Sequence, residues 1–462
     1  MRVVVVGGGF AGLAAAVELQ ERRHLVTLFE RRGILGGRAT SFRDSTFHEE
    51  VDNGTHLMVG AYTGTLDLLD RAGAAGLLAF QPELALDYQD EVGRSSLSCP
   101  PLPAPLHLLG GLLSLRLPWR VRLDAARFAW AVRFGGEPQG TLAEFFLKTG
   151  QSPETRRLLW DPLATAIVND TPERAAAVLF VRVFREAFLT SRSASRLIFN
   201  AAGWGTLVEK IGDYFVNRGG HIQRRTRVLS VLLSKGEAAG IDFLRHPADR
   251  ESVARGVPGT KERLDADAIV LAVPWGEVPG LLPEDVRGPF EHLGELGSSP
   301  IVSVEVWLDT VVVDRLMLGL RREEMEWVFD KGRLFGRQGP PQHLSFIVSA
   351  AHRSTPRPNA SLVASAEGAL RRYFPGMEKA RILKSLVFRE PTATFLPTPE
   401  HEALRPEART SIPGLVLAGD WTRTGLPATI EGAVRSGRAA ALALEAWLRT
   451  RRDAGRPGEA AG

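Results

Sequence analysis

The first thirty residues of the chain contain the pattern that most restricts its fold. Four consecutive valines, Val3–Val6, form an apolar run typical of strands buried on both faces of a parallel sheet. The run Gly7–Gly12 follows, and the Ala- and Leu-rich stretch 13–22 is expected to be helical. A second strand is expected at Leu25–Phe29, with Glu30 at its end. This order predicts a βαβ unit of an α/β fold.

The glycine spacing predicts a dinucleotide site at the turn after the first strand. Gly7 allows a tight turn, Gly9 lets backbone N–H groups approach a pyrophosphate, and Gly12 lets the helix pack closely on the strand. The helix N-terminus also carries partial positive charge. The alternative is a glycine-rich turn in an unrelated α/β protein, but the acid at the end of the second strand favours nucleotide binding. The predicted contacts are Gly7, Gly9, Phe10, Ala11, Gly12 and Glu30.

The remainder of the chain alternates between strand-rich and mixed segments. Apolar strand patterns return at 227–233, 240–244 and 268–273, and a later one, 414–418, runs directly into Gly419-Asp420. A two-part architecture follows, in which a Rossmann-like nucleotide-binding domain is interleaved with an α+β substrate domain. We expect the first domain to comprise 1–60, 202–290 and 400–449, the second 61–201 and 291–399, and the polar segment 450–462 to be a disordered tail.

Composition excludes several classes of function. The 57 basic and 53 acidic residues nearly balance, so nucleic acid is not an expected partner. A single cysteine, Cys99, allows no intrachain disulfide, which favours the cytoplasm. No run of eighteen uncharged apolar residues occurs, so we expect no membrane-spanning helix. We assign no metal site.

Two further motifs carry a resemblance to a known superfamily. Arg31 follows the acid, and Gly36-Gly37-Arg38 comes shortly after it. Near the other end, Leu417-Ala418-Gly419-Asp420 precedes the run 428–437, Ala-Thr-Ile-Glu-Gly-Ala-Val-Arg-Ser-Gly. With these motifs the whole chain resembles the flavin amine oxidases and phytoene desaturases, a superfamily of FAD-binding proteins with two dinucleotide-binding-type domains.

The resemblance implies FAD as the cofactor and assigns further residues to it. It places a second nucleotide-contacting loop around Gly36-Gly37-Arg38, and a backbone contact to adenine at Val228. It places the Asp420 carboxylate at the ribityl or pyrophosphate region, and the N-terminus of the last helix at the flavin ring. These implied contacts are Arg31, Gly36, Gly37, Arg38, Val228, Gly419, Asp420, Thr429 and Ile430.

Shorter motifs resemble a narrower group. They are 52–60 (Asp-Asn-Gly-Thr-His-Leu-Met-Val-Gly), Asp161-Pro162-Leu163 with Asn169, 203–207 (Gly-Trp-Gly-Thr-Leu), and 420–422 with 425–429. In this order they are similar to the squalene-associated FAD-dependent desaturases, whose characterised activity is hydroxysqualene dehydroxylation in hopanoid biosynthesis. The resemblance implies a C30 isoprenoid lipid as substrate and an electron donor that the sequence does not identify.

Other functions stay open at this stage. Amine oxidases typically carry an aromatic cage residue where this chain has Thr429, so an amine substrate is disfavoured. A carotenoid-type desaturase or isomerase is the main enzymatic alternative. A lipid carrier resembling the prenyl-protein-binding GDP-dissociation inhibitors is the non-enzymatic one, although the intact nucleotide motif and Gly419-Asp420 speak against it.

The loop that should follow the second nucleotide motif contains two candidates for catalysis, Asp52 and His56. Loss of hydroxide needs a proton donor or a polarising group, and either side chain could serve. Alternatively, Asp52 caps a turn and His56 is a core histidine. Three tryptophans could line a hydrocarbon tunnel or belong to the core: Trp204, Trp307 and Trp421.

The segment 116–134 interleaves five arginines with large apolar residues, and Asp124 is its single acid. Such a segment could lie on an anionic membrane, here the inner face of the cell membrane, as a peripheral contact. It could equally be an amphipathic helix packed on the substrate domain.

Overall fold

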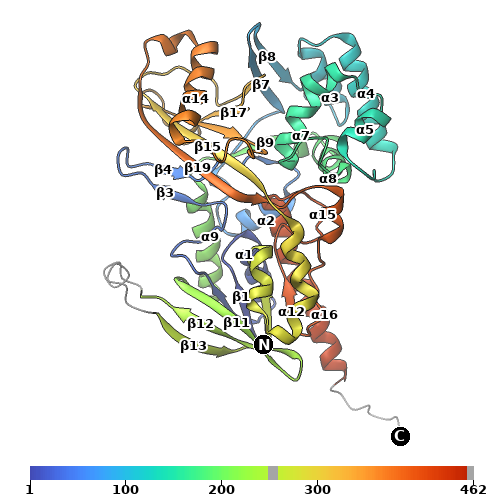
Figure 1. The fold of residues 1–462 in the computed structure, drawn as a ribbon, viewed down its shortest axis with the longest axis vertical. Helices are drawn as coiled ribbons and strands as arrows, with labels where there is room; N and C mark the ends of the chain where they lie inside the picture. The colour runs from blue at the N-terminus through green and yellow to red at the C-terminus, as the bar shows by residue number, and fades with distance from the viewer. Residues whose placement is uncertain (248–258, 455–462) are drawn as a thin grey trace.

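The computed structural model describes residues 1–247 and 259–454, and it has two lobes (Figure 1). Strand β1 (Arg2–Val6) lies at the centre of a five-stranded parallel sheet in the order β10-β2-β1-β14-β20. This arrangement confirms the predicted α/β fold. The other strands are β2 (Leu25–Phe29), β10 (His221–Gln223), β14 (Ala268–Leu271) and β20 (Leu415–Leu417).

The valines of β1 are all buried because the sheet is covered on both faces. Val3 and Val5 pack in the core beneath the helices, whereas Val4 and Val6 pack toward an antiparallel three-stranded sheet. The helices on the first face are α1 (Phe10–Glu21), α2 (Thr63–Arg71), α9 (Trp204–Asn217) and α16 (Ile430–Ala454), and the small sheet consists of β11 (Thr226–Ser234), β12 (Glu237–Arg245) and β13 (Thr260–Asp265).

The second lobe contains a seven-stranded mixed sheet in the order β19-β15-β18-β17-β16-β7-β8. Helix α14 (Asn359–Tyr373) covers one face of this sheet. Its strands are β7 (Ala85–Asp90), β8 (Gly93–Ser98), β15 (Ser299–Leu308), β16 (Met317–Leu320), β17 (Trp327–Asp330), β18 (Gln342–Val348) and β19 (Ile382–Thr394).

A group of helices lies beside this sheet (Figure 1). These helices enclose a cluster of aromatic rings. Phe128 is fully buried there against the rings of Trp160 and Phe184. The helices are α3 (Leu106–Ser114), α4 (Trp119–Phe134), α5 (Leu142–Lys148), α6 (Pro153–Thr155), α7 (Asp161–Val168) and α8 (Ala177–Phe184).

The remaining elements are shorter. They are β3 (Ser41–Arg43), β4 (Glu50–Asp52), β5 (Met58–Val59), β6 (Leu78–Phe80), β9 (Leu197–Asn200), α11 (Val278–Leu281), α12 (Glu284–Arg287), α13 (Lys331–Leu334) and α15 (Pro399–Leu404). No helix among residues 1–247 and 259–454 has the length and apolar character needed to cross a bilayer.

The prediction of a disordered tail from residue 450 onward is wrong at its start. Helix α16 continues to Ala454. Residues 450–454 contain no Gly or Pro to stop a helix, and Arg451 pairs with Glu237 and lies over the ring of Trp447. Residues 455–462 of the predicted tail lie outside the described residues.

Candidate functional site

A cavity of about 800 Å³ lies where the carboxyl ends of β1, β2 and β14 meet β15 and β19 of the second sheet. This is the expected place for a ligand in an open parallel sheet. Its walls contain most of the residues singled out from the sequence, namely Gly7, Gly9, Phe10, Ala11, Glu30, Arg31, Gly36, Gly37, Arg38, His56, Val228, Gly419, Asp420, Thr429 and Ile430.

The three glycines of the first motif serve different structural needs. Gly7 has a φ of +108°, and a Cβ there would lie 2.3 Å from the carbonyl oxygen of Ala272. Gly12 lies outside the cavity wall, and a Cβ on it would meet the Gly7 carbonyl oxygen at 1.9 Å. At Gly9 the nearest atom to an added Cβ is Gly37 Cα, 3.7 Å away. Gly7 and Gly12 therefore shape the turn, and Gly9 keeps the space in front of α1 free.

Glu30 is buried at the end of β2, and its carboxylate organises the loop. It accepts hydrogen bonds of 2.8 Å from the backbone N–H of Gly8 and from that of Arg32. A carboxylate can accept about four hydrogen bonds, so acceptor sites remain for the hydroxyls of a ligand. Arg31 at the cavity rim pairs with Glu277 at 2.9 Å.

The second glycine loop lies against the first. Gly36 and Gly37 both have positive φ, and the Gly36 N–H donates to the Gly8 carbonyl at 2.8 Å. Arg38 then reaches across the cavity, where it donates to the Asp420 carboxylate at 2.5 Å and to the Ala393 carbonyl at 2.7 Å. This side chain joins the nucleotide loop, the Gly-Asp turn and strand β19.

A buried arginine that the sequence analysis missed holds the turn after β20. Arg405 is fully buried, and its guanidinium donates to the backbone carbonyls of Asp420, at 3.1 Å, and of Thr422. It also forms an ion pair with Glu402 at 2.6 Å. Its sequence neighbourhood contains no recognised motif, and only the fold shows that it positions Asp420.

The N-terminus of α16 opens into the cavity beside this turn. Thr429 accepts a hydrogen bond of 3.0 Å from the Gly432 N–H, and so caps the helix. Glu431 in the first turn is directed away from the cavity, because it accepts from the N–H groups of Gly64 and Thr65 at the start of α2. No aromatic residue occupies position 429.

The two candidates for catalysis differ in their surroundings. Asp52 lies behind the cavity wall, where its carboxylate accepts from Lys331 at 2.7 Å, Ser41 at 2.6 Å and the Trp204 N–H at 2.9 Å. Burial alone would raise the pKa of Asp52, but the Lys331 charge and the hydrogen bonds outweigh it, and the pKa falls below its usual value. Asp52 is therefore ionised near neutral pH and has no proton to donate.

His56 lies in the cavity wall, and its Nε2 atom is buried without a hydrogen-bond partner among the described residues. Burial lowers the pKa of His56 to about 4, against the raising effect of nearby Asp52. The imidazole is therefore neutral near pH 7. Its hydrogen bond to the backbone of Arg38 orients the ring in the wall.

The three singled-out tryptophans are almost completely buried. Trp421 belongs to the cavity wall and donates to the Val273 carbonyl at 3.1 Å. Trp204 and Trp307 are core residues outside that wall. Trp307 stacks on His343, which is itself bonded to Glu305 at 2.9 Å in a buried polar cluster on β15 and β18.

The cavity fits a dinucleotide such as FAD. Helix α1 has no side-chain cap and no acid in its first turn, so its N–H groups are available to a pyrophosphate. The space in front of Gly9 is the space that a phosphate group needs.

Comparison with known proteins agrees with this geometry. The sequence profile described as flavin-containing amine oxidoreductase matches residues 10–444. The chain belongs to this family. It is an FAD-dependent oxidoreductase with the predicted flavoprotein fold.

Relatives of this flavoprotein include hydroxysqualene dehydroxylases and 15-cis-phytoene desaturases. The chain is 26% identical to the hydroxysqualene dehydroxylase of Zymomonas mobilis, over 95% of this chain and 98% of the relative. It is 24% identical to the 15-cis-phytoene desaturase of Synechococcus elongatus, over 99% of both chains. In structure it resembles an oxidoreductase from Methanosarcina mazei, with a TM-score of 0.71 and 17% identity over 95% of this chain and 99% of the other.

Proposed function

We propose that this flavoprotein removes the hydroxyl group of hydroxysqualene reductively to give squalene. The observation that carries the proposal is the neutral His56 imidazole in the wall of the FAD cavity, whose Nε2 atom has no hydrogen-bond partner among the described residues. A hydrocarbon polyene has no group to pair with this nitrogen, whereas an allylic alcohol has one. The full-length similarity to a hydroxysqualene dehydroxylase supports the same reaction.

In the proposed reaction the allylic C–O bond breaks and a C–H bond forms at the same carbon. Bound in its reduced form, FAD would supply a hydride to this carbon and a proton to the departing hydroxyl, so that the alcohol becomes squalene and water. The His56 ring hydrogen-bonds the substrate hydroxyl and so fixes the direction of the C–O bond. Asp52 is a positioning residue, because its bonds to Trp204 and Lys331 hold the loop that carries His56.

The residues assigned to FAD follow from the same cavity. The glycines of the first loop would leave room for the pyrophosphate, Glu30 would accept from the adenosine ribose, and Val228 on β11 would contact the adenine. Asp420, held by Arg38 and Arg405, would accept from the ribityl or pyrophosphate region. The α16 N-terminus at Thr429 and Ile430 would face the flavin ring, where a helix dipole stabilises negative charge.

A desaturase is the second candidate, because the phytoene desaturase relative covers 99% of this chain. A single-turnover experiment without oxygen distinguishes the two reactions. Enzyme with reduced FAD carrying deuterium at N5 is mixed with hydroxysqualene, and we expect deuterated squalene to form as the flavin reoxidises. Unchanged hydroxysqualene, together with desaturation of phytoene by the oxidised enzyme, would assign the protein to the desaturases.

A further inference from the structure

Two neighbouring helices at one end of the second lobe leave large apolar side chains exposed. Helices α3 and α4 lie at the opposite end of the molecule from the N-terminus and the end of α16 (Figure 1). The backbone carbonyl of Leu115, between the two helices, accepts a hydrogen bond of 3.0 Å from Arg122 on α4. Beneath this turn, Leu115, Leu117 and Val121 form a small buried cluster. The helix pair is therefore a fixed part of the lobe.

Helix α3 turns its leucines outward because its other side is pressed against the preceding segment. His107 and Gly111 are buried on that side, and a Cβ on Gly111 would lie 2.5 Å from the Cys99 sulfur. The opposite side carries a leucine stripe at helical spacing, which is 43–67% exposed and which the sequence analysis did not identify. The stripe consists of Leu106, Leu109 and Leu113, with Leu102 in the preceding turn.

Helix α4 has two apolar sides. One side, with Val121, Phe128 and Val132, is buried in the lobe, so the helix does pack on the substrate domain. The other side carries Trp119, Leu123, Trp130 and Phe134, which are 42–67% exposed. At about 100° per residue these four positions fall within roughly 60° of arc. An apolar stripe on the outer side serves no packing purpose within the described chain.

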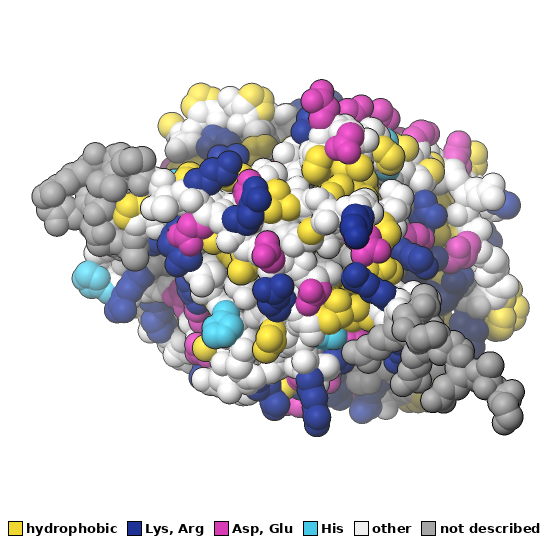
Figure 2. Space-filling model, turned by 90° about the horizontal axis from the view of Figure 1, so that it is seen from below, with side chains coloured by type: hydrophobic (Ala, Val, Ile, Leu, Met, Phe, Trp, Pro, Cys, Tyr) yellow, Lys and Arg dark blue, Asp and Glu magenta, His cyan; other side chains and the backbone are white. Residues whose placement is uncertain are grey.

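The charges around these stripes have one sign. Residues 106–134 contain five arginines and a single acid, Asp124. Asp124 is buried and accepts from Thr155 at 2.8 Å, so its charge faces inward. Arg120 and Arg133 lie over the exposed rings of Trp119 and Phe134. By contrast, Figure 2 shows basic and acidic side chains interspersed at the opposite end of the molecule.

We infer that α3 and α4 form a docking face for an anionic lipid bilayer. The leucine and aromatic stripes enter the boundary between headgroups and acyl chains, and the arginines bind lipid phosphates. A second copy of the chain is a poorer partner, because a symmetric contact would place these arginines against one another. The inference does not depend on dehydroxylation, since it rests only on the exposed side chains and their charge.

Sedimentation of the full-length, FAD-loaded protein with vesicles tests this inference. We expect binding to phosphatidylcholine vesicles that contain phosphatidylglycerol, and much weaker binding to phosphatidylcholine alone. Leu109→Glu with Leu113→Glu should reduce binding to the anionic vesicles about tenfold or more, and so should Arg120→Glu with Arg133→Glu. Quenching of tryptophan fluorescence by brominated lipid should show that Trp119 and Trp130 lie at the bilayer boundary. This quenching should decrease when both residues are replaced by Ser.

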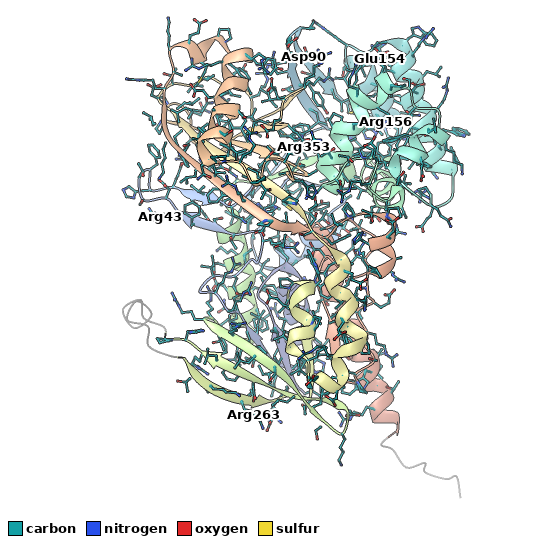
Figure 3. The ribbon with its side chains drawn as sticks, viewed as in Figure 1. Arg43, Asp90, Glu154, Arg156, Arg263 and Arg353 are labelled. Carbon is teal, nitrogen blue, oxygen red and sulfur yellow. The ribbon has the colours of Figure 1, made fainter. Side chains whose placement is uncertain are left out.

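Matched controls make the test specific. Leu25 on β2 and Leu442 on α16 are 68% and 56% exposed, so Leu25→Glu with Leu442→Glu introduces the same double change in the other lobe. Arg43 and Arg263 lie away from α3 and α4 (Figure 3), and Arg43→Glu with Arg263→Glu matches the change in charge. All controls should bind like the wild type. The inference fails if the wild type stays in the supernatant, if controls lose binding equally, or if Leu113→Glu instead dissociates a dimer in light scattering.

Discussion

The Lys331 ammonium donates to the Asp52 carboxylate at 2.7 Å, and each side chain is only 1% exposed. The two residues are 279 positions apart in the chain. Lys331 begins α13, next to the second sheet, whereas Asp52 ends β4, just before the loop with His56. The pair therefore ties the loop that lines the cavity to the second lobe.

Breaking this pair should destabilise the fold. Lys331→Met leaves a buried carboxylate without its cation, which costs about 3–5 kcal/mol in the free energy of unfolding. Asp52→Asn combined with Lys331→Met should recover part of that loss, because replacing both charges is often close to neutral. Urea unfolding followed by circular dichroism measures both. As a control, Arg315→Met removes an exposed ion pair with Asp87 and should cost about 1 kcal/mol or less. If Lys331→Met lowers the free energy of unfolding no more than Arg315→Met does, the buried pair does not stabilise the fold.

His56 should make stability depend on pH in a defined window. Its pKa is about 4 in the folded protein and 6.5 in a solvated chain. Between these values the unfolded chain binds more protons, so the free energy of unfolding rises with pH and reaches its full value above pH 6.5. The shift corresponds to about 3 kcal/mol. Between pH 4 and 6.5, the free energy of unfolding of His56→Gln should change less with pH than that of the wild type. An identical pH dependence for the two proteins would contradict the lowered pKa of His56.

His56 should also affect turnover more than FAD binding. His56→Ala removes the hydrogen bond to the substrate hydroxyl, and each 1.36 kcal/mol of lost transition-state stabilisation costs about tenfold in rate. Single-turnover squalene formation should slow by about tenfold to a hundredfold, whereas the flavin absorbance of the purified protein stays the same. His56→Gln, which retains a hydrogen-bonding group, should recover part of the rate. Equal rates for all three proteins would exclude a catalytic role.

Gly9 should be essential for FAD binding. The wild-type protein should be yellow, with FAD that is released on acid denaturation because it is not covalently bound. Gly9→Glu places a side chain and a negative charge in front of α1, where the pyrophosphate lies, and should give a folded but colourless protein. Gly76→Glu is the matched control, because a Cβ there meets no atom within 4 Å. A yellow Gly9→Glu variant would show that the pyrophosphate lies elsewhere.

Arg405 should control FAD affinity through Asp420. Arg405→Lys keeps the charge but cannot reach all the carbonyls of the 420–422 turn together, because an ammonium lacks the guanidinium fork. We expect FAD to bind about tenfold more weakly by fluorescence titration. Arg423→Lys, at a half-exposed position nearby, is the control and should bind FAD like the wild type. If only thermal stability falls, Arg405 stabilises the fold without positioning Asp420.

Much of the nucleotide-binding lobe could be predicted from the sequence because its signals are local. The apolar run of β1, the glycine turn and the start of α1 are contiguous in the sequence. Glycines in such a turn can be interpreted locally, because only a residue without a Cβ adopts these backbone conformations freely. Strands β2, β11, β14 and β20 are likewise predicted close to their observed positions. The same local reasoning missed the end of α16, where helix-forming arginines looked like a polar tail.

The sequence by itself determined that this chain builds a nucleotide-binding α/β fold, since that information resides in short contiguous patterns. Only the tertiary structure decided which polar groups are buried together. Asp52 became an ionised partner of Lys331 and not a proton donor, His56 became a neutral group in the cavity wall, and Arg405 became the support of Asp420. The physical reason is that pKa values and hydrogen-bond partners depend on desolvation and distance, which residues far apart in sequence acquire only when the chain folds.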